Sequence, residues 1–359
     1  MRIGIIGGGQ LARMLIIAGY PLGLEFAVYE TRAEHCVADL APVYQPSQLE
    51  QFIATSDVIT YENENIEVNW LQDIAQRKTI YPNPSVLSYL QDRLTEKNLF
   101  TELGIETNRY FEVDNTADLT TLADKLAFPF IIKTRRGGYD GKGQYVIADE
   151  AALRNLQLPI NQFGYLAEAF VDFEAEYSCI AVFSHDSQMQ VYDLCCNQHH
   201  KGILRHSYPW QADNQEVKAY QKCAADYLQR IAQKFNYVGI LVGEFFKVGN
   251  KLLANEIAPR VHNSGHWTIE AAATSQFANH LRAIAHLPLG RTDTLITSHM
   301  SNIIGTWPDR QALLKIGNLS LHDYCKTPRP GRKLGHVTLL GTEACQQALA
   351  QLNILLETL

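Results

Sequence analysis

The sequence of 359 residues lacks the marks of several protein classes. No apolar run approaches the roughly 18 residues of a membrane-spanning helix, and the start, MRIGIIGGGQ, lacks the long apolar segment and cleavage site of a signal peptide. The seven cysteines include no Cys-x-x-Cys pair, so neither a zinc site nor a disulfide framework is indicated, and the formal net charge of -7 argues against a general nucleic-acid binder. We therefore expect a cytoplasmic protein of two or three domains, with reduced core cysteines and without nucleic-acid or membrane partners.

Two short apolar runs near residue 250 each carry one acid. Gly239 to Val248 contains Glu244, and the run after the next turn contains Glu256. A carboxylate in a buried strand needs a cation, and strand side chains alternate between two faces. A two-residue loop of Gly249 and Asn250 would put the acids on opposite faces, whereas an odd loop centred on a left-handed Asn250 would put them on one face. We predict the odd loop and a magnesium site; two solvated acids on an edge hairpin are the alternative.

The segment after Glu256 is unusually rich in polar donors. Arg260, His262, Asn263 and Ser264 follow one another closely. A loop of this composition, directly after a buried strand, predicts a site for an anionic or polar ligand.

The first residues predict a strand, a glycine loop and a helix, at Arg2 to Ile6, Gly7 to Gly9 and Gln10 to Ala18. The amino terminus of such a helix can receive a phosphate. The pattern Gly7-x-Gly9-x-x-Ala12, with Glu30 at the end of the next strand, also fits a dinucleotide fingerprint. A nicotinamide or flavin oxidoreductase therefore stays open at this point.

A single amphipathic helix is predicted over Ser85 to Leu103, capped by Gly104. Arg93 and Lys97 stand four residues apart and should line one outer stripe of it. Taken alone, that pair indicates an ordinary solvated face.

A glycine-rich segment, TRRGGYDGKGQ, follows the predicted strand Phe130 to Lys133 and precedes the strand Tyr145 to Ala148. A flexible loop between two strands can fold backbone amides over phosphates. The pattern G-x-x-x-x-G-K-[ST] of a Walker loop occurs nowhere.

The predicted strand Tyr165 to Val171 enters a hinge, a connector that ends in Glu176. Free backbone groups at the end of this strand could bind an adenine edge, and Glu176 could hold ribose hydroxyls.

Other segments suggest anion binding and a helical support. His199 could donate to a phosphate, and Gln215 to Phe235 should form a long helix under the sheet of the two acids. Prolines, a glycine and four cations make Tyr324 to Lys333 a stiff loop suited to a phosphate monoester. The two basic clusters of the chain are Lys133, Arg135, Arg136 and Lys142, then Lys326, Arg329, Arg332 and Lys333.

The order of these parts resembles the ATP-grasp superfamily. The segments GGGQLARM, DRLTEKNLF, RRGGYDGKGQ, NEIAPRVHNSGHW and RPGRKLGH look like those of the 5-(carboxyamino)imidazole ribonucleotide synthases of purine biosynthesis. The resemblance implies an α/β ATP-grasp fold, with a Rossmann-like doubly wound domain at 1–95, a small lid domain at 96–172, a large ATP-grasp domain at 173–290 and a β-rich carboxy-terminal subdomain at 291–359.

The resemblance also implies an ATP-dependent carbon–nitrogen ligase. Bicarbonate would attack the terminal phosphate of ATP to give carboxyphosphate, and the carboxyl group would pass to the amine of 5-aminoimidazole ribonucleotide. Catalysis would rest on Arg260, Lys133 and Asp140. The ATP site would comprise Arg93, Lys133, Gly138, Tyr139, Asp140, Gly141, Lys142, Gly143, Gln144, Glu168, Ala169, Phe170, Val171, Glu176, His199, Asn255 and Glu256, with Mg²⁺ on Glu244 and Glu256. The ribonucleotide would contact Gln10, Tyr139, Asp140, Arg260, His262, Asn263, Ser264, Lys326 and Arg332.

Two departures and several rivals stay open. Ala258 stands where many ATP-grasp enzymes have a metal-binding Asn, and the segment Tyr61 to Asn65 reads YENEN where the family has YEFEN. A formate-using glycinamide ribonucleotide transformylase would share the ATP residues. A catalytically inactive nucleotide-binding regulator is disfavoured by the presence of the acids, Lys133 and Arg260. The family suggests a homodimer.

Overall fold

The amino-terminal part is a parallel sheet in a computed structural model that describes residues 1–113, 119–138, 143–210, 215–341 and 343–357. The strand order is β3-β2-β1-β4, and every pair is parallel. Alternate residues of β2 enter opposite cores: Phe26 and Val28 pack with α1 and α10, whereas Ala27 and Tyr29 pack with α2 and α3. The elements are β1 Arg2–Ile6, α1 Gln10–Gly19, β2 Glu25–Tyr29, β3 Val43–Tyr44, α2 Leu49–Thr55, β4 Val58–Tyr61 and α3 Val68–Ala75. The predicted doubly wound domain is confirmed.

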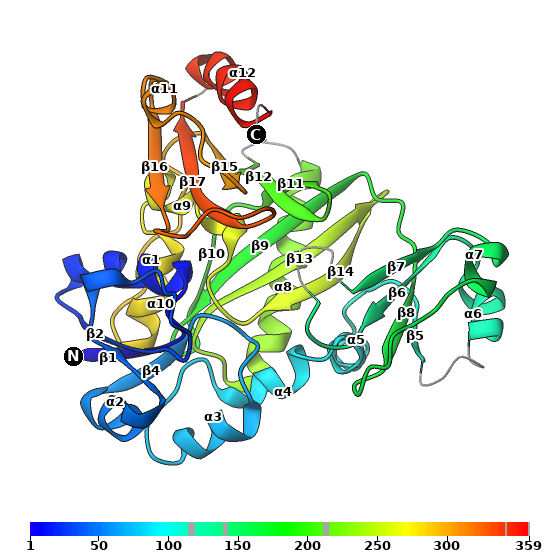
Figure 1. Ribbon diagram of the computed structural model, residues 1–359, viewed down its shortest axis with the longest axis horizontal. Helices are drawn as coiled ribbons and strands as arrows, with labels where there is room; N and C mark the ends of the chain where they lie inside the picture. The colour runs from blue at the N-terminus through cyan, green and yellow to red at the C-terminus, as the bar shows by residue number, and fades with distance from the viewer. Residues whose placement is uncertain (114–118, 139–142, 211–214, 342, 358–359) are drawn as a thin grey trace.

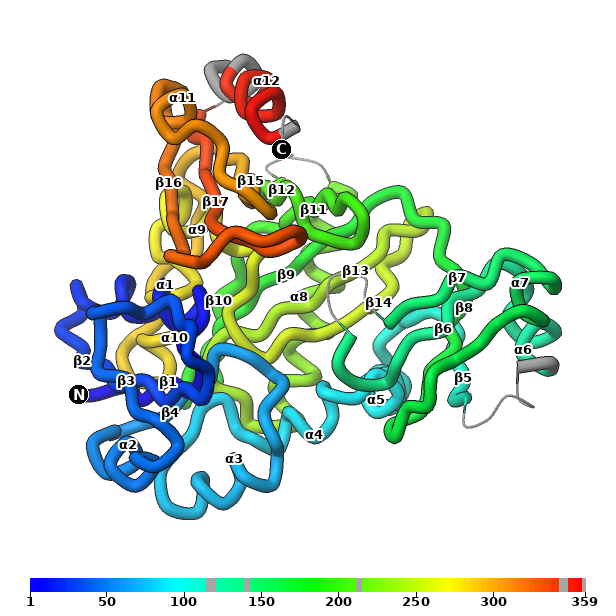
Figure 2. The backbone as a smooth tube through the Cα atoms, in the orientation of Figure 1, coloured from blue at the N-terminus to red at the C-terminus, as the bar shows by residue number. Residues whose placement is uncertain are grey.

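A small antiparallel sheet stands apart from the rest, to the right in Figure 1 and Figure 2. Its strand order is β5-β8-β6-β7, with two helices packed on it. The elements are β5 Tyr110–Val113, α6 Leu119–Leu126, β6 Phe130–Thr134, β7 Gln144–Ile147, α7 Glu150–Arg154 and β8 Tyr165–Ala169. The predicted glycine loop joins β6 to β7, and its residues 139–142 lie outside the described part of the chain.

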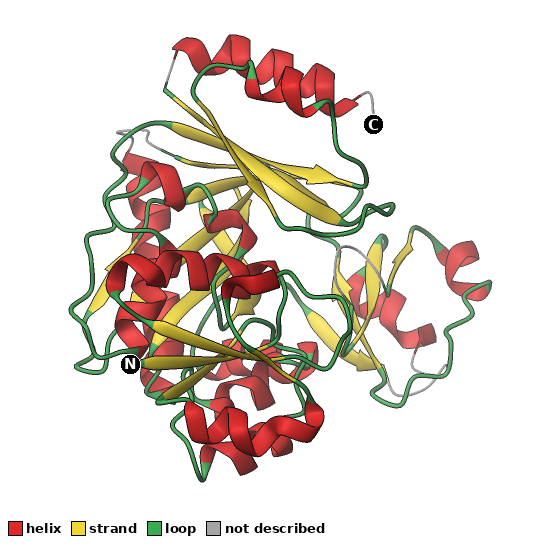
Figure 3. Cartoon of the chain, turned by 60° about the vertical axis from the view of Figure 1, so that its left-hand side comes forward, coloured by secondary structure: helices red, strands yellow, loops and turns green. Residues whose placement is uncertain are grey.

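The largest sheet is antiparallel and runs β14-β13-β9-β11-β12-β15-β17-β16, with β10 beside β9. Pairing of β12 with β15 joins the carboxy-terminal strands to the central ones. Figure 3 shows α12 lying over the end of the sheet that these carboxy-terminal strands form. The strands are β9 Ala175–Phe183, β10 Met189–Val191, β11 Cys195–His200, β12 Ile203–Pro209, β13 Gly239–Val248, β14 Lys251–Ala258, β15 Ser298–Ile304, β16 Leu319–Asp323 and β17 Lys333–Leu340. The helices are α8 Gln215–Phe235, α9 Thr268–Ala271, α10 Gln276–Ile284, α11 Arg310–Leu314 and α12 Glu343–Glu357.

The turn between β13 and β14 differs from the predicted one, although its consequence holds. Val248 pairs with Lys251, so the loop has two residues, and the left-handed residue is Gly249 with φ of 56°. This loop alone would put the two acids on opposite faces. A register shift between Glu244 and Phe245 corrects the alternation, because one extra residue on β14 moves Glu256 opposite Glu244. The prediction of an odd loop is wrong, and the prediction of a shared face is right.

The single helix predicted over 85–103 is also wrong. The chain forms a short turn of helix, α4 Leu87–Leu90, and then α5 Arg93–Glu102. Asp92 separates them, because its extended backbone and its side chain cap the amino terminus of α5. The predicted outer stripe is wrong as well, since Lys97 is only 1% exposed.

The cysteine prediction holds in part. Among the six cysteines whose side chains the structure describes, all free, Cys36, Cys179, Cys195 and Cys196 are buried, Cys223 is half-buried and Cys325 is exposed. None of the described helices combines the length and apolar character needed to cross a bilayer.

Asp92 joins the helix cap to the small domain, and this gives a stability prediction. Its Oδ1 accepts from Leu94 N, while Arg135 donates from Nε to Oδ1 (3.0 Å) and from Nη2 to Oδ2 (2.9 Å). Because Asp92→Ala removes the cap and leaves Arg135 without its buried partner, we expect urea unfolding to report a loss of ~2 to 4 kcal/mol. Asp92→Asn keeps a cap acceptor and should lose less.

Asp226→Ala is the control for this substitution. It breaks an exposed pair with Arg230 four residues along α8, which should change the free energy of unfolding by less than ~1 kcal/mol. Equal losses for Asp92→Ala and Asp226→Ala would contradict the role given to Asp92.

Candidate functional site

A cleft of about 1220 Å³ lies where the three sheets meet. Most of the predicted site residues line it: Gln10, Arg93, Lys133, Gly138, Gln144, Glu168, Ala169, Phe170, Val171, Glu176, His199, Glu244, Asn255, Glu256, Arg260, His262 and Asn263. Tyr139, Asp140, Gly141 and Lys142 lie outside the described residues. Gly143, Ser264, Lys326 and Arg332 are not among the lining residues, although Ser264 and Lys326 contact residues that are.

The two strand acids face each other on the cleft side of the sheet. Glu244 and Glu256 are cross-strand partners, and burial together with the charge of Glu256 raises the pKa of Glu244 to about 7. Glu96 of α5 accepts from Ile257 N (2.7 Å), and its pKa rises to about 8 for the same two reasons. Acids held this close raise one another's pKa because like charges oppose ionisation. Paired carboxylates of this kind suit a divalent cation.

Lys133 projects from β6 towards the same region. Its Nζ donates to Glu168 Oε2 (2.9 Å) on the neighbouring strand β8. Burial alone would raise the pKa of Glu168, but the ammonium groups of Lys97 and Lys133 hold it down at about 2. Glu168 is therefore a buried anion whose side chain points to the lysines.

Arg93 holds the start of the glycine loop. Its guanidinium donates to Thr134 O (3.0 Å) and to Gly138 O (2.7 Å), so the first residue of α5 fixes the backbone where the loop leaves β6. Sequence reasoning on its own treated this side chain as solvated; the structure makes it part of the cleft wall.

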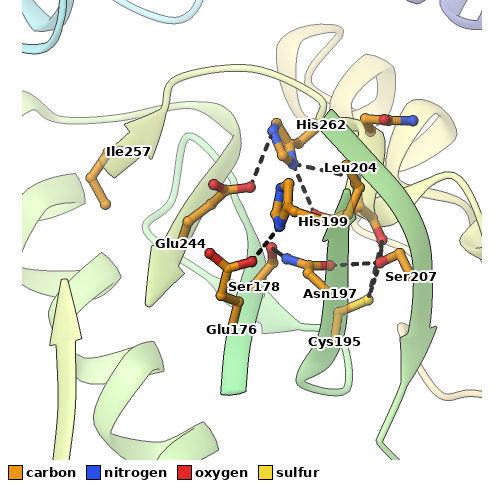
Figure 4. A network of polar contacts seen from close by, with 12 residues as sticks. Glu176, Ser178, Cys195, Asn197, His199, Leu204, Ser207, Glu244, Ile257 and His262 are labelled. Carbon is orange, nitrogen blue, oxygen red and sulfur yellow. Dashed lines mark hydrogen bonds and ion pairs between the residues drawn. The ribbon is translucent and has the colours of Figure 1, made fainter. Parts of the chain in front are cut away.

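Glu176 and His199 form a pair on neighbouring strands, as Figure 4 shows. Burial would lower the pKa of His199, but the hydrogen bond and charge of Glu176 raise it above its usual value. Beneath them, Asn197 donates to Ser178 Oγ (2.5 Å) and accepts from Ser207 Oγ (2.8 Å). This buried network stiffens the floor of the cleft.

The polar loop after β14 is held from several sides. Both Nε and Nη2 of Arg260 donate to the carboxylate of Glu64, and His262 Nδ1 shares a hydrogen bond with Ser264 Oγ (2.8 Å). His262 Nε2 lies 3.5 Å from Glu244 Oε1, but burial and the charge of Arg260 keep its pKa well below the usual value, so this contact involves a neutral ring.

Asn263 is fixed by reciprocal amide bonds with Asn302 of β15 (3.0 and 2.7 Å). Because Asn302 also donates to Leu204 O of β12 (2.9 Å), the polar loop after β14 is tied to the carboxy-terminal strands of the large sheet.

The first glycine loop already has internal acceptors. Gly9 N donates to Glu62 Oε1 (2.8 Å) and Gly8 N donates to Glu30 Oε2 (2.8 Å), while Ala12 N lies 3.4 Å from Glu62 Oε2. These backbone amides are thus satisfied by side chains of the protein, and the phosphate predicted at this helix terminus stays a prediction. Glu30 also accepts from Arg32, which leaves it poorly placed for the ribose of a dinucleotide.

The second basic cluster is joined to the first domain. Lys326 Nζ donates to Gln10 Oε1 (2.5 Å), and Arg332 donates from Nη1 and Nη2 to Glu34 (2.8 and 2.9 Å). Arg332 holds the pKa of Glu34 down at about 2. Cations predicted for a phosphate are therefore partly engaged by a carboxylate.

Sequence reasoning missed several residues in the cleft wall or directly behind it, namely Glu64, Glu96, Lys97 and Asn108; Lys333, which also lines the cleft, belongs to the basic cluster predicted for a phosphate. The segment that contains Glu64 was noticed, but its contacts were left open. No local signal marks the others, because their positions depend on how α5 and the β5 segment meet β14.

Comparison with known proteins gives a consistent result over the whole chain. Residues 1–91 match the ribonucleotide synthetase preATP-grasp domain, residues 98–277 the ATP-grasp domain, and residues 298–350 the phosphoribosylaminoimidazole carboxylase C-terminal domain. The N5-carboxyaminoimidazole ribonucleotide synthase of Pseudomonas aeruginosa is 40% identical over 99% of this chain and 100% of its own length.

Solved structures agree with this. The crystal structure of N5-carboxyaminoimidazole ribonucleotide synthetase from Thermus thermophilus superposes with a TM-score of 0.92, at 42% identity over 99% of both chains. The synthase from Aspergillus clavatus, in complex with ADP and 5-aminoimidazole ribonucleotide, superposes with a TM-score of 0.86, at 26% identity over 98% of both chains.

The raised pKa of Glu244 leads to a prediction about stability. Its pKa of about 7 in the fold exceeds its ordinary value of 4.5, so ionising Glu244 opposes folding. This penalty is complete above pH 7, shrinks as the pH falls and is absent below about pH 4.5. We expect Glu244→Gln to raise the free energy of unfolding of the metal-free protein by ~1 to 3 kcal/mol at pH 8, and by much less at pH 5.

Urea unfolding at both pH values, with and without Mg²⁺, checks this. Magnesium should stabilise the unsubstituted protein and stabilise Glu244→Gln less. Glu150→Gln on the exposed helix α7 is the control and should show no such pH-dependent gain. A Glu244→Gln variant that is less stable at pH 8 than at pH 5, relative to the unsubstituted protein, would overturn the electrostatic account.

Proposed function

Because the chain belongs to the N5-carboxyaminoimidazole ribonucleotide synthases, ATP-dependent ligases of purine biosynthesis, we propose that its cleft joins ATP, bicarbonate and 5-aminoimidazole ribonucleotide. The product is N5-carboxyaminoimidazole ribonucleotide, which is another name for 5-(carboxyamino)imidazole ribonucleotide. The observation that carries the proposal is the convergence of the facing acids Glu244 and Glu256 with Lys133 and Arg260 on one cleft. A reaction that transfers a phosphoryl group to a weak nucleophile needs this density of charge.

ATP would lie between the small sheet and the β13–β14 hairpin. Lys133 is suited to the phosphates, since a buried ammonium beside the glycine loop can follow the charge that develops there. The backbone of Glu168 to Val171 would read the adenine edge, and Glu176 with His199 would take the ribose hydroxyls and a phosphate. Arg93, Asn255 and the loop from Gly138 to Gln144 would complete the ATP site.

The acids Glu244 and Glu256 fit a magnesium ion. Magnesium prefers oxygen ligands such as paired carboxylates. The raised pKa of Glu244 shows that its ionised form is unfavourable there, and a bound cation would stabilise that form. When bound, Mg²⁺ would neutralise phosphate charge; since Ala258 offers no side-chain ligand, water would fill the remaining positions.

Carboxyl transfer would take place between the ATP site and the loop after β14. A bicarbonate oxygen attacks the terminal phosphorus and ADP leaves, which gives carboxyphosphate. The amine nitrogen of the ribonucleotide then attacks the carboxyl carbon, phosphate leaves, and the amine loses a proton. Arg260 would stabilise the negative charge of carboxyphosphate. His262, Asn263 and Ser264, with Tyr139 and Asp140, would surround the ribonucleotide.

The 5'-phosphate of the ribonucleotide would lie against Lys326 and Arg332, beside Gln10. The occupied amides of the first glycine loop support this choice, because Gly8 N already donates to Glu30 and Gly9 N to Glu62. Guanidinium groups bind phosphate in a bidentate manner, so a phosphate can exchange with Glu34 on Arg332.

We also propose the division of the chain into units 1–95, 96–172, 173–290 and 291–359, a homodimeric assembly and a cytoplasmic location. These follow from the family resemblance and from the composition.

The decisive experiment is ADP release from ATP and Mg²⁺. We expect ADP to form with bicarbonate and to rise with 5-aminoimidazole ribonucleotide. Formate with glycinamide ribonucleotide should not support ADP release. ADP release with these two substrates would favour the transformylase instead. Binding of a nicotinamide cofactor without ATP would favour an oxidoreductase.

Arg260→Ala tests the reaction centre. Losing this guanidinium should lower turnover of the ribonucleotide by about 10² to 10³, or ~3 to 4 kcal/mol, because charge on carboxyphosphate loses its stabilisation. Steady-state measurement of ribonucleotide carboxylation checks this, with the surface variant Arg230→Ala as control. Near-normal turnover of Arg260→Ala would rule out the assigned role.

Arg332 and Glu34 make a matched pair for the phosphate site. Arg332→Ala should raise KM for 5-aminoimidazole ribonucleotide by about 10- to 100-fold, as expected for a lost charge-assisted contact, while KM for ATP stays within about twofold. Glu34→Gln removes the competing carboxylate and should lower the same KM. An unchanged KM for the ribonucleotide in both variants would move the phosphate site elsewhere.

A further inference from the structure

A fully buried lysine lies behind the ATP site, and none of the roles above uses it. Lys97 is 1% exposed, and its Nζ donates to Thr107 Oγ1 (2.7 Å), Asn108 Oδ1 (2.9 Å) and Ala254 O (3.2 Å). These three acceptors are uncharged. Burial of an ammonium group is unfavourable, so this one needs all three hydrogen bonds. The acceptors belong to two segments, the approach to β5 and the strand β14, and Lys97 itself comes from α5.

The ammonium holds the oxygen end of the Asn108 amide, with Thr107 Oγ1 as a second donor at 3.3 Å. An ammonium group only donates, so it must face the amide oxygen of Asn108. The amide nitrogen is thereby turned towards Glu168 Oε2 (3.1 Å) and Ala169 O (3.0 Å). A flipped amide would set its oxygen against a carboxylate and a carbonyl, which are both acceptors. Lys97 at the oxygen end and the two acceptors at the nitrogen end favour the same orientation, and Lys97 fixes the position of the amide between them.

The oriented amide acts on two parts of the nucleotide site. Glu168 Oε2, which accepts from Asn108, is the same atom that accepts from Lys133 Nζ. Ala169 belongs to the hinge backbone that would read adenine. A substitution of Lys97 that displaces Asn108 would therefore alter the positions of both Lys133 and the hinge backbone at Ala169.

We propose that Lys97 is a positioning residue for ATP, which orients the Asn108 amide and through it Glu168, Lys133 and the hinge. The inference rests on the proposed function, because it requires ATP in this cleft. Lys97 would touch no substrate. Its hydrogen bond to Ala254 O joins α5 to the β13–β14 hairpin, which carries Glu244 and Glu256.

Lys97→Met tests the proposal by removing the charge and the donors at nearly constant volume. We expect its Kd for ATP, measured by isothermal titration calorimetry without the ribonucleotide, to rise about 10- to 100-fold, as misplacement of binding groups does. KM for ATP should rise in parallel, and KM for the ribonucleotide should stay within about twofold. Lys222→Met, on an exposed part of α8, is the control and should bind ATP normally.

Asn108→Asp separates positioning from simple stabilisation. The aspartate keeps its shape and its contact with Lys97, but it loses the donor to Glu168 and sets a carboxylate beside a carboxylate. We expect weaker ATP binding with a cooperative thermal transition retained. If Lys97→Met fails to fold, this variant carries the test alone.

Coupling to Lys133 gives the sharpest outcome. If Lys97 acts through Lys133, then Lys97→Met should weaken ATP binding much less in a Lys133→Met background than in the unsubstituted protein. Full additivity would overturn the proposal, as would folded Lys97→Met or Asn108→Asp that binds ATP within twofold of normal. Failure of the unsubstituted protein to bind ATP would instead overturn the proposed function.

Discussion

Mutual repulsion of carboxylates at the end of the β13–β14 hairpin governs the rest of the site. Glu244 and Glu256 face each other, and Glu96 approaches from α5; burial, together with the charge of Glu256, raises the pKa of both Glu244 and Glu96. A sheet does not gather acids in this way for stability, since each raises the free energy of ionising the others. The arrangement becomes favourable when a cation joins it, which links folding of this region to ligand binding.

Three cations of the proposed substrate sites are paired with carboxylates of the protein. Lys133 pairs with Glu168, Arg260 pairs with Glu64, and Arg332 pairs with Glu34. On the proposed function, a phosphate bound by one of these cations would replace a carboxylate, so the net gain in binding free energy would be smaller than the contact itself suggests. The exchange also keeps the cations oriented in the free protein, which reduces the ordering required on binding.

Local patterns predicted most elements but failed where tertiary contacts decide. The two acids could be assigned to one face only by assuming an odd loop between the strands, and that assumption was wrong. A bulge at Asn255 brings them to one face instead, and rules for turn sequences do not predict such a bulge within a strand. Lys97 looked like a surface residue because helical spacing carries no information about partners. Its burial depends on Thr107, Asn108 and Ala254, the last of which lies 157 positions away in sequence.

The first glycine loop shows why a motif alone could not separate two functions. Its glycines and Glu30 satisfy a dinucleotide fingerprint, and its helix terminus suits a phosphate. Those amides already donate to Glu30 and to Glu62, and Glu62 is 6% exposed and directly follows β4, more than fifty residues along the chain. A parallel sheet brings the carboxyl ends of β1 and β4 to one edge, so the acid that fills the loop is a product of topology. On the proposed function, the phosphate of the ribonucleotide would be left to the cations of the carboxy-terminal part, and the contacts of Lys326 with Gln10 and of Arg332 with Glu34 would bring that part against the first domain to complete the site.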